Sequence, residues 1–450
     1  MKDYTPIIGL EVHIELSTKS KMFCGCAADY FGKPPNTFTC PVCLGLPGAL
    51  PVPNKKDVEW SILLGLALGC KINEESKFDR KHYFYPDLPK GFQISQYDQP
   101  LCTNGQLLVK TFVTKEKLIR IQRVHIEEDT GKLIHTEVEG KKVALVDLNR
   151  CGVPLVEVVS EPDFRTIDEV DQYMKKLQQI VRYLGISSAD MEKGTMRIEP
   201  SISMAEESIL SKGKLPMYKV ELKNINSFRF VRKALEYEIQ RQTDLLVGGE
   251  TPIQQTRGWN ESKGTTIAQR KKEEAQDYRY FPEPDIPPMR WEKRVVEEIR
   301  EKLPELPDEK MRRFVSIYSL NEYDADKLCE TKERAYFFEE CVKLAKEKKL
   351  EKVNAKVVAN WLINKKINLE KVKLTDLMQE IFESQVVEEI PEEQLKKEIK
   401  HILEYNPNAV GDYKNGKKQV FAFLMGLVLK KIGKQASIEK VKQELIKQLS

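Results

Sequence analysis

The sequence predicts an α+β protein with a largely antiparallel sheet in its N-terminal part and only helices in its C-terminal part. Strand-like segments cluster in groups over the first 290 residues instead of alternating regularly with helices, which favours antiparallel pairing. A proline-rich segment, YRYFPEPDIPP at 278–288, then precedes a run of helical patterns. Four prolines in eleven residues exclude a helix there and favour an extended backbone.

Within the N-terminal part, the strand-like segments show either period-two alternation or a short apolar run. We expect strands at 7–16, 118–127, 143–148, 153–159 and 218–222. Apolar residues recur with helical spacing in three further segments, and the second of these is closed by a glycine. We therefore expect helices at 54–69, 167–184 and 228–246.

Beyond residue 290 every periodic segment is helical. The segments are WEKRVVEEIREKL, DEKMRRFVSIY, ERAYFFEECVKLAKE, AKVVANWLINKKI and EEQLKKEIKHILEY. A last unit begins near residue 395, in which we expect NPNAVGDYKNGKKQ to be a loop and VFAFLMGLVLKKIGK an apolar helix capped by lysines. These patterns predict three domains, at 1–290, 291–394 and 395–450.

Composition indicates a soluble globular protein, since 41% of the 450 residues are hydrophobic and 32% are charged. No window approaches the ~20 apolar residues of a membrane span, and the first residues lack the layout of a signal peptide. We therefore expect a cytoplasmic location. The net charge is only +4, but the last 50 residues hold nine lysines and four acidic residues. This basic tail predicts contact with a polyanion such as nucleic acid, or else a solvated lysine-rich surface.

The most specific local pattern is a set of four cysteines. Cys24 and Cys26 are followed, after 13 intervening residues, by Cys40 and Cys43. Two short paired spacings can supply four thiolates to a tetrahedral zinc ion, and a site with four protein ligands is structural. We expect zinc to hold the loop TFTCPVCLGLPGALP; the alternative is four free thiols. The other cysteines are dispersed and are expected to be packing residues.

The opening segment IIGLEVHIEL places Glu11, His13 and Glu15 on one face of a strand and apolar residues on the other. Glu11 and His13 can be neighbouring ligands of a divalent cation. An oxygen-rich set with one imidazole suits magnesium or manganese better than zinc. Further carboxylates can complete the set, whereas the alternative is a solvated, charged strand face. The candidates are Glu127 and Glu128 in RVHIEEDTGK, and Glu157, a lone acid in an apolar run.

Several common catalytic patterns are absent from the sequence. The chain contains neither G-x-x-x-x-G-K-[ST] nor G-x-G-x-x-G, so any nucleotide is bound in another way. None of the five histidines lies near a G-x-S-x-G elbow, and nothing indicates a serine or cysteine nucleophile.

Six blocks resemble, in the same order, the signature blocks of the GatB family, the B subunits of tRNA-dependent amidotransferases. They are IGLEVHIELSTKSKMFC, HYFYPDLPKGFQISQYDQP, HIEEDTGK, VDLNRCGVPLVEVVSEPD, VELKNINSFRFV and YRYFPEPDIPP. The end of the chain, with ANWL, NPNAVGDYKNGKKQ and FLMGLVLKK, resembles the YqeY-like region of that family. The resemblance covers essentially the whole chain. It implies a cradle-like N-terminal domain, an all-helical connector and a small helical YqeY-like tail.

The resemblance implies a ligase that forms a carbon–nitrogen bond. With ATP and Mg²⁺ it would phosphorylate the side-chain carboxylate of Glu-tRNA(Gln), Asp-tRNA(Asn) or both, and ammonia would then replace the phosphate. A glutaminase A subunit would supply the ammonia from glutamine, and a small C subunit would complete the complex. One alternative is a scaffold that positions the tRNA acceptor end without carrying the chemistry. Another is a paralogous subunit, which usually carries an inserted domain for which this chain has no room.

The resemblance also implies roles for individual residues. The catalytic residues would be Glu11, His13 and Glu128, which with Glu127, Glu157 and Glu199 would also bind magnesium. Further residues would line the pocket for the aminoacyl end: Tyr83, Tyr85, Lys90, Gln93, Asn149, Arg150, Tyr278, Arg279 and Tyr280. Lysines of the tail would contact tRNA phosphates, namely Lys414, Lys417, Lys418, Lys430, Lys431 and Lys434.

One segment departs from the family pattern. The chain reads MEKGTMRIEPSISM at 191–204, where the family commonly reads like MEKGSLRxDANISxR. Glu199 stands in place of an aspartate and still offers a carboxylate, about one methylene further out. Pro200 removes a backbone donor, and Ser201 replaces an asparagine. The CxC…CxxC set is also not general in the family, so the zinc prediction rests on cysteine spacing.

Overall fold

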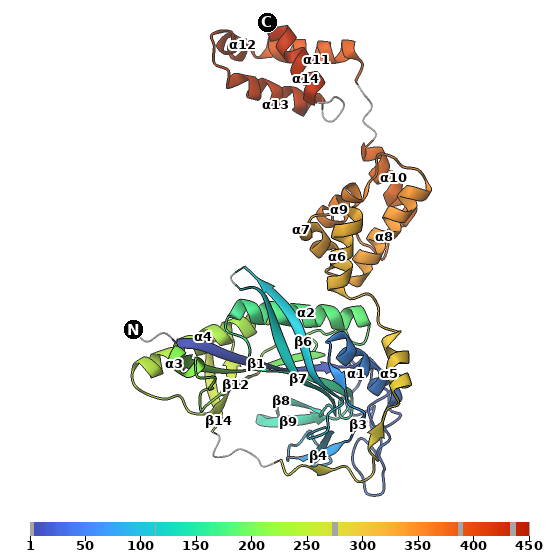
Figure 1. The fold of residues 1–450 in the computed structure, drawn as a ribbon, viewed down its shortest axis with the longest axis vertical. Helices are drawn as coiled ribbons and strands as arrows, with labels where there is room; N and C mark the ends of the chain where they lie inside the picture. Colours follow the sequence, from blue (N-terminus) through green and yellow to red (C-terminus); the bar gives the residue numbers. More distant parts are fainter. Residues whose placement is uncertain (1–3, 113, 272–277, 386–389, 433–437, 450) are drawn as a thin grey trace. The chain divides into compact units, whose positions relative to one another are not determined.

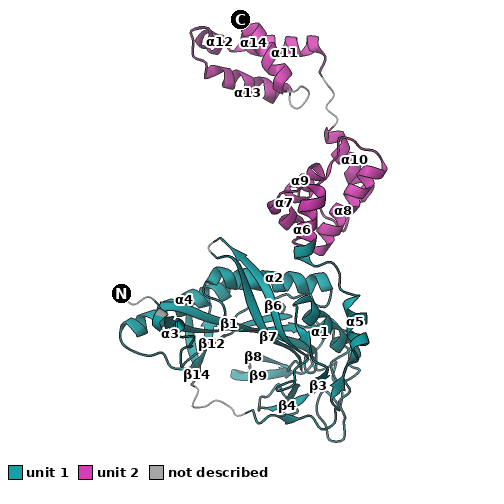
Figure 2. Ribbon diagram, in the orientation of Figure 1, with its two compact units in different colours: residues 1–309 teal, residues 310–450 magenta. Residues whose placement is uncertain are grey.

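The structure is a computed structural model that describes residues 4–112, 114–271, 278–385, 390–432 and 438–449. The chain divides into two compact units, residues 1–309 and 310–450 (Figure 2). The first unit combines a large sheet with helices, and the described residues of the second form only helices (Figure 1). The predicted fold class is therefore confirmed.

The first unit is built on a nine-stranded sheet whose central strand, β1 (Tyr4–Glu15), is the opening segment of the chain. β1 pairs antiparallel with β11 (Met196–Glu206) and with β10 (Pro154–Ser160). The strand order is β14-β13-β12-β11-β1-β10-β7-β6-β2, and only the β12–β13 pair is parallel among these described strands. The other strands are β2 (Lys71–Ile72), β6 (Cys102–Thr111), β7 (Lys115–Glu128), β12 (Val220–Lys223), β13 (Gln255–Asn260) and β14 (Thr265–Lys271).

Three smaller sheets complete the strand content described. In one of them the proline-rich segment returns to the early part of the chain, because β15 (Phe281–Pro282) pairs with β4 (Asp79–His82). The tyrosines that follow β4 and those that precede β15 are thereby brought together. The remaining strands are β5 (Phe92–Ser95) beside β4, β16 (Met289–Arg290) beside β3 (Glu75–Ser76), and the hairpin of β8 (Lys132–Val138) and β9 (Lys141–Asp147).

The two faces of the large sheet differ in chemistry because side chains alternate along each strand. Leu10, Val12 and Ile14 of β1 face the core, where α2 (Ile167–Leu184) and α4 (Phe228–Val247) cover the sheet (Figure 1). The opposite face carries the carboxylates and imidazoles of the same strands. The helix predicted at 167–184 is confirmed at both ends, with a capping box at its start and a left-handed glycine at its end.

The other predicted elements of the first unit are also present, with shifted ends. All five expected strands exist, and the helices predicted at 54–69 and 228–246 are α1 (Lys55–Ala67) and α4. Strands β6, β8, β11, β13 and β14 were not predicted: β6 and β13 each contain a glycine, β11 contains a proline, and β8 and β14 carry mostly polar side chains. The unit also contains α3 (Glu207–Leu210) and α5 (Lys293–Arg300).

The second unit contains two separate apolar clusters, one in 314–381 and one in 395–449. One prediction here is wrong. The segment expected to be a loop forms helix α12 (Pro407–Lys414), which starts with a proline at its first turn and is followed by Gly416 in a left-handed conformation. The other helices are α6 (Pro307–Tyr318), α7 (Glu322–Cys329), α8 (Lys332–Glu347), α9 (Ala355–Asn364), α10 (Leu374–Gln385), α11 (Glu392–Tyr405), α13 (Val420–Ile432) and α14 (Ile438–Leu449).

The described helices can be compared with the length and apolar character of a membrane span. Among the described residues, none combines the length with the apolar character that crossing a bilayer requires.

Candidate active site

The polar face of the sheet carries ionisable side chains that line up across neighbouring strands. His13 of β1 pairs with Glu157 of β10, and Glu157 pairs in turn with His125 of β7. Two residues before His13 on the same strand, Glu11 of β1 pairs with Glu199 of β11. Antiparallel register therefore gathers residues from four distant parts of the sequence on one surface.

The first cluster is centred on Glu157, which is buried. Its Oε2 lies 3.4 Å from Nε2 of His13 and 3.2 Å from Nε2 of His125. The same imidazole nitrogen of His125 lies 3.3 Å from Oε1 of Glu127. His13, Glu127 and Glu157 can each offer a ligand atom within 4.8 Å of the others. This donor set of one imidazole and two carboxylates fits a magnesium or manganese ion.

Charge is concentrated at this cluster. Burial alone would lower the pKa of His13, but the carboxylate of Glu157 outweighs burial and raises the pKa to about 9. Burial likewise opposes ionisation of Glu157, yet His125 and His13 hold its pKa well below the usual range. The pKa of Glu127 is lowered to about 2, because Lys81 and His125 overcome the effect of burial. The carboxylates are therefore ionised and available as ligands near neutral pH.

A second cluster of carboxylates lies beside the first on the same face. Glu11, Glu199 and Glu221 can each offer an oxygen within 4.8 Å of the others. The pKa of Glu11 is raised by burial and by the neighbouring carboxylates of Glu157, Glu221 and Glu199. Lys223 partly offsets this crowding, with its Nζ 2.9 Å from Oε2 of Glu199. The longer side chain of Glu199 thus still places its carboxylate beside Glu11.

Glu128 lies apart from both clusters. The alternation of β7 continues to the end of the strand, so Glu128 lies on the face opposite to Glu127. Its carboxylate forms an ion pair with Lys90 and accepts a hydrogen bond from the backbone N–H of Ile94 at 3.0 Å. Both side chains of the ion pair are buried.

Five tyrosines gather next to the first cluster, where β4 meets the proline-rich segment. Tyr83 lies edge-on to Tyr85 and to Tyr278, with ring centroids 6.3 and 6.0 Å apart. Tyr280 is edge-on to Tyr278, at 6.1 Å, and stacks on Tyr97 at 4.2 Å. Through these contacts the two tyrosine-rich motifs form one surface.

Gln93 connects this aromatic surface to the carboxylates. Its amide nitrogen donates to Oε2 of Glu127 at 3.0 Å, and its oxygen accepts from the hydroxyl of Tyr83 at 3.3 Å. Lys81 adds a cation 5.1 Å from the ring centroid of Tyr278, and the nearby charge of Glu127 raises its pKa despite burial. The carbonyl of Arg279 lies 3.1 Å from Nδ1 of His82, next to the same surface.

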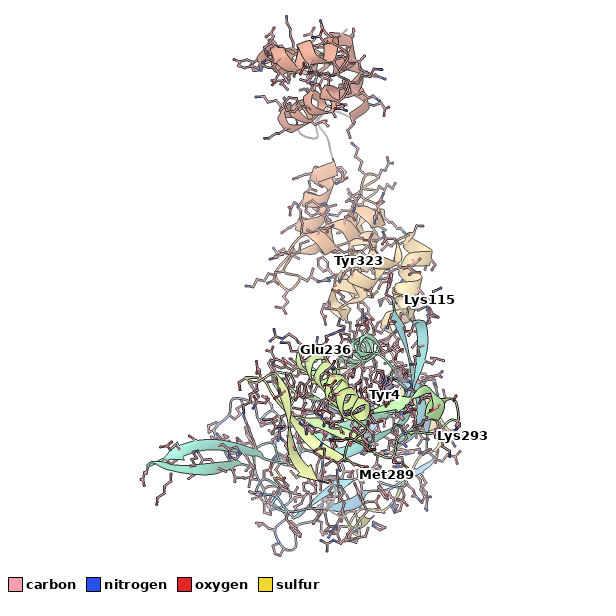
Figure 3. The ribbon with its side chains drawn as sticks, turned by 90° about the vertical axis from the view of Figure 1, so that its left-hand side faces the viewer. Tyr4, Lys115, Glu236, Met289, Lys293 and Tyr323 are labelled. Atoms are coloured by element: carbon pink, nitrogen blue, oxygen red, sulfur yellow. The ribbon has the colours of Figure 1, made fainter. Side chains whose placement is uncertain are left out.

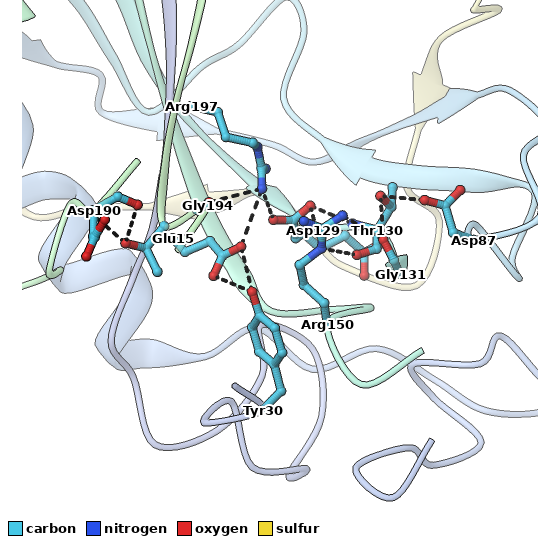
Figure 4. A network of polar contacts seen from close by, with 12 residues as sticks. Glu15, Tyr30, Asp87, Asp129, Thr130, Gly131, Arg150, Asp190, Gly194 and Arg197 are labelled. Atoms are coloured by element: carbon cyan, nitrogen blue, oxygen red, sulfur yellow. Dashed lines mark hydrogen bonds and ion pairs between the residues drawn. The ribbon is translucent and has the colours of Figure 1, made fainter. Parts of the chain in front are cut away.

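Asn149 and Arg150 use their side chains to hold backbone. The amide of Asn149 bonds to the backbone of Phe38 and of Pro34, which belong to the loop between the cysteine pairs. Arg150 donates to the carbonyl oxygens of Thr130 and Gly131, at 2.9 and 2.6 Å (Figure 4). Both side chains therefore fix the loops that border the polar face.

A buried network beyond His13 joins the end of β1 to the cysteine-bearing loop (Figure 4). Glu15 accepts a hydrogen bond from the hydroxyl of Tyr30 at 3.1 Å, and Arg197 donates to Asp129 at 2.7 Å. Burial and the adjacent carboxylate of Asp129 raise the pKa of Glu15 to about 8. Glu15 is therefore engaged in structure and does not belong to either carboxylate cluster.

The four cysteines expected to bind zinc lie together, with sulfur atoms within 4.8 Å of one another: Cys24, Cys26, Cys40 and Cys43. A hydrogen bond from the thiol of Cys24 lowers the pKa of Cys43 to about 5, which favours the thiolate form of Cys43. Lys21 is fully buried beside them, with Nζ 3.7 Å from the sulfur of Cys43 and 2.7 Å from the carbonyl of Phe38. Four thiolates in this arrangement fit a tetrahedral zinc ion.

The lysines of the tail belong to the helical unit. Lys414 ends α12, Lys430 and Lys431 lie in the last turn of α13, and Lys417 pairs with Asp412 at 3.0 Å. Lys418 lies between these helices, and Lys434 falls outside the described residues.

Sequence reasoning missed His125 and Glu221 as site residues, and Lys81 and Lys223 as their cationic neighbours. The sequence could have identified His125 as a site residue, because His125 and Glu127 lie two residues apart on one strand, as Glu11 and His13 do. Glu221 has none, since its place depends on the register of β11 against β12.

Comparisons with known proteins agree with this site. The family model described as the GatB/GatE catalytic domain matches residues 6–297, and the model described as the GatB domain matches residues 320–449. The chain is 46% identical to the B subunit of an aspartyl/glutamyl-tRNA(Asn/Gln) amidotransferase from Thermotoga sp. (strain RQ2), with 97% of each chain covered.

Two further relatives carry the same description. The one from Thermoanaerobacter sp. (strain X514) is 46% identical, with 99% of each chain covered. The one from Persephonella marina is 44% identical, with 99% of this chain and all of the relative covered. Similarity of this extent over both units shows the family: the chain belongs to the GatB family of amidotransferase B subunits.

Proposed function

We propose that the chain is the B subunit of a tRNA-dependent amidotransferase that acts on Glu-tRNA(Gln), Asp-tRNA(Asn) or both. In this reaction ATP phosphorylates the side-chain carboxylate of the misacylated residue, and ammonia then displaces phosphate to leave an amide. The observation that carries the proposal is the row of His13, Glu157 and His125 on the polar face of the sheet. A tRNA-binding scaffold has no need of such a set of ionised carboxylates and imidazoles.

Residues of the two clusters would hold magnesium. His13, Glu127 and Glu157 form one donor set, and Glu11, Glu199 and Glu221 form another. Bound there, magnesium would offset charge on the phosphate oxygens during phosphoryl transfer. Glu157 is held ionised by its two histidine neighbours, so it can bind a cation without first losing a proton. Glu128 was expected in this set, but its ion pair with Lys90 favours a role in holding the neighbouring backbone.

The tyrosine surface would receive the aminoacyl end of the tRNA. Lys81 lies over the ring of Tyr278, which contacts Tyr83 and Tyr280. Gln93 links Tyr83 to Glu127. A substrate carboxylate placed there would meet the ammonium of Lys81 on one side and the metal ligands on the other. Binding it at this point would align it for attack on the phosphorus of ATP. Tyr85, Lys90 and Arg279 would border the same surface.

The four cysteines would bind a structural zinc ion. Their thiolates would fill the coordination shell and leave no position for substrate. Lys21 supports this assignment because a fully buried ammonium needs a nearby negative charge. Within the part of the chain that the structure describes, no carboxylate lies within 4 Å of it, and the thiolate of Cys43 is its available counter-charge.

The helical unit would contact tRNA, and partner subunits would complete the complex. The two apolar clusters of the helical unit support a separate tail at 395–450, whereas α5 packs on the core of the first unit, so the connector predicted at 291–394 would begin after α5. Lysines of that tail would contact tRNA phosphates. No nucleophile for glutamine hydrolysis is evident in the sequence, which supports a separate glutaminase A subunit as the ammonia source, with a small C subunit.

The test is amidation by the reconstituted complex. Glu-tRNA(Gln), ATP and Mg²⁺ are supplied with ammonium chloride in place of glutamine, so that the glutaminase step is bypassed. The proposal expects Gln-tRNA(Gln) to form with wild type and to fall at least ~100-fold with Glu157→Gln, while tRNA still binds. Unchanged amidation by Glu157→Gln would instead support the scaffold alternative.

A further inference from the structure

Two of the five tyrosines next to the first cluster form a parallel stack. The rings of Tyr97 and Tyr280 have centroids 4.2 Å apart and planes inclined by 10°. The contacts of Tyr278 with Tyr83 and with Tyr280 are edge-on instead. Tyr280 covers one face of the Tyr97 ring, yet 59% of Tyr97 remains exposed. An exposed aromatic ring at the end of a stack can receive a further flat ring on its open face.

Tyr280 connects this stack to the reacting groups of the proposed function. Burial raises the pKa of its hydroxyl to about 12, so the hydroxyl is neutral at physiological pH. The charges of Lys81, Glu127 and Glu157 also act on this hydroxyl, which therefore lies near all three. Between this cation and these metal ligands the substrate carboxylate would lie. The stack thus begins beside the position of the substrate carboxylate, and Tyr97 is its outer end.

The position of Tyr97 is fixed by the strand that also holds Glu127. In β5, Oγ of Ser95 donates to Oε1 of Glu127 at 2.6 Å, and the amide nitrogen of Gln93 donates to Oε2 at 3.0 Å. Tyr97 follows two residues after Ser95, so the two Cα atoms are at most about 7 Å apart. The backbone N–H of Tyr97 donates to Oδ2 of Asp79 in β4 at 3.0 Å. The paired strands β4 and β5 therefore set the distance between the exposed ring and the carboxylates.

The charges around Tyr97 favour a neutral ring over a phosphate. Asp79 bonds to its backbone, Asp98 follows it in the chain, and Lys77 pairs with both aspartates, at 3.0 and 2.8 Å. One lysine thus faces two aspartates beside the ring. A nucleobase is flat and uncharged, and stacking on an aromatic side chain is a common way to bind an unpaired nucleotide. In a charged tRNA the aminoacyl group is attached to the ribose of the 3′-terminal adenosine, so an adenine lies one ribose away from it.

We propose that the ring of Tyr97, backed by Tyr280, stacks on the base of the 3′-terminal adenosine of the tRNA, an inference that rests on the proposed function. The aminoacyl side chain extends from there past Tyr280 to Lys81 and the metal ligands. The stacked base fixes the ribose and the residue attached to it, which contributes to the alignment of the side-chain carboxylate for phosphorylation. No bond is made or broken at this subsite.

The experiment measures how much the terminal base contributes to tRNA binding by the complete complex. tRNA(Gln) is ligated to a synthetic 3′ end that carries glutamate through a stable amide, either with adenine at the last position or with no base there. A stacked base contributes about 5- to 150-fold to affinity, so wild type should bind the adenine form more tightly by such a factor. Tyr97→Ala should reduce this ratio of affinities to nearly one and keep wild-type affinity for the tRNA that lacks the base.

Two further variants control for the ring and for folding. Tyr97→Trp keeps a flat ring at this position and should preserve the ratio. Phe112→Ala removes another fully exposed aromatic ring, at the end of the β6–β7 ribbon where Figure 3 labels Lys115, and should leave the ratio at the wild-type value. The thermal midpoint of each variant shows that it is folded.

The proposal is overturned if wild type binds the two tRNAs equally. It is also overturned if Tyr97→Ala weakens binding of both tRNAs by the same factor, because Tyr97 then only supports the fold. ATP carries adenine as well, so binding of labelled ATP with Mg²⁺ to the same variants is measured by equilibrium dialysis. If Tyr97→Ala weakens ATP binding and leaves the ratio for the two tRNAs unchanged, the ring holds the base of ATP and the proposal is wrong.

Failure of the inference is distinguishable from failure of the proposed function. If wild type amidates Glu-tRNA(Gln) at the expense of ATP while it binds the two tRNAs equally, only the assignment of Tyr97 is wrong. If wild type forms no Gln-tRNA(Gln) from ammonium chloride, the proposed function is wrong, and the ratio still decides separately whether Tyr97 holds the terminal base.

Discussion

His13 of β1 and Glu157 of β10 are directly paired across the central strands of the sheet, with 3.4 Å between Nε2 of the imidazole and Oε2 of the carboxylate. His125 approaches the same oxygen from the other side, at 3.2 Å. A single buried carboxylate is thus held ionised by two imidazoles from strands on either side of it. Glu157 is therefore the residue on which the proposed chemistry most depends.

Stability should depend on pH through Asp57, which is fully buried in α1. Among the described residues only Ser61 bonds to its side chain, and burial raises its pKa well above the ordinary value of 3.8. The folded protein therefore keeps a proton that the unfolded chain releases, so the free energy of unfolding falls as pH rises above about 4. Asp57→Asn removes this dependence. Urea unfolding at pH 5 and at pH 8 measures the free energy of unfolding of both proteins. Relative to wild type, the variant should be more stable at pH 8 than at pH 5.

An equal difference between variant and wild type at both pH values would show that Asp57 is ionised in the folded state. Asp98→Asn is a suitable control, since Asp98 is exposed and paired with Lys77.

Lys21 should control how tightly zinc is held. Lys21→Met leaves the negative charge of the thiolates uncompensated, so the complex should release zinc to a chelator faster. Residues that contact metal ligands typically change affinity 10- to 100-fold, which sets the expected effect at about that size. The measurement is zinc release followed with a colorimetric chelator.

Lys19→Met removes an exposed lysine from the same segment and should release zinc at the wild-type rate. If Lys21→Met also releases zinc at the wild-type rate, the buried ammonium does not compensate the charge of the thiolates.

The ion pair of Lys90 and Glu128 should contribute strongly to stability. Both side chains are buried, so Glu128→Gln leaves an uncompensated ammonium and should lower the free energy of unfolding by about 3–5 kcal/mol. Replacing both residues, as Lys90→Met with Glu128→Leu, should recover much of the loss. Chemical denaturation of the three proteins measures this.

Glu116→Gln is the matched control, because its ion pair with Lys110 is exposed. If the Glu128→Gln variant has full stability but no activity, Glu128 acts in catalysis, as the sequence analysis expected.

Tail lysines should make tRNA binding salt-dependent. Lys414, Lys418, Lys430 and Lys431 are replaced by glutamine, and the slope of log K against log salt should flatten by about 0.7–0.9 for each lysine that contacts a phosphate. Filter binding at several salt concentrations measures the slope. Glutamine substitutions at Lys346, Lys348, Lys349 and Lys352 of the connector provide a charge-matched control. Equal slopes for the two sets would remove the tail from the tRNA contact surface.

Half of the site could be predicted from the sequence because that half depends on local alternation. Glu11 and His13 lie two apart on one strand, and Glu157 is a lone acid in an apolar run, so each could be inferred from its own segment. The alternation also continues through Glu128, so its carboxylate lies away from that of Glu127 and pairs with Lys90. The partners Glu221 and Lys223 depend on cross-strand register, which no single segment encodes.

The helical unit shows a second reason why a prediction from sequence can fail. The segment at 406–419 contains glycines, asparagines and a proline within a short span, a composition typical of a loop. It nevertheless forms α12, because Val410 and Tyr413 pack against the apolar cluster of the tail. Tertiary packing outweighed local propensity there, as it commonly does for short helices.

The most direct test of the proposed chemistry is release of labelled γ-phosphate from ATP by the complex with Glu-tRNA(Gln) and Mg²⁺, with every ammonia source withheld. Wild type is compared with Glu157→Gln and with Glu11→Ala. We predict tRNA-dependent turnover in wild type and a loss of at least ~100-fold in both variants, with tRNA affinity unchanged. Turnover that survives both substitutions would contradict the proposed chemistry and leave the polar face of β1 a structural surface.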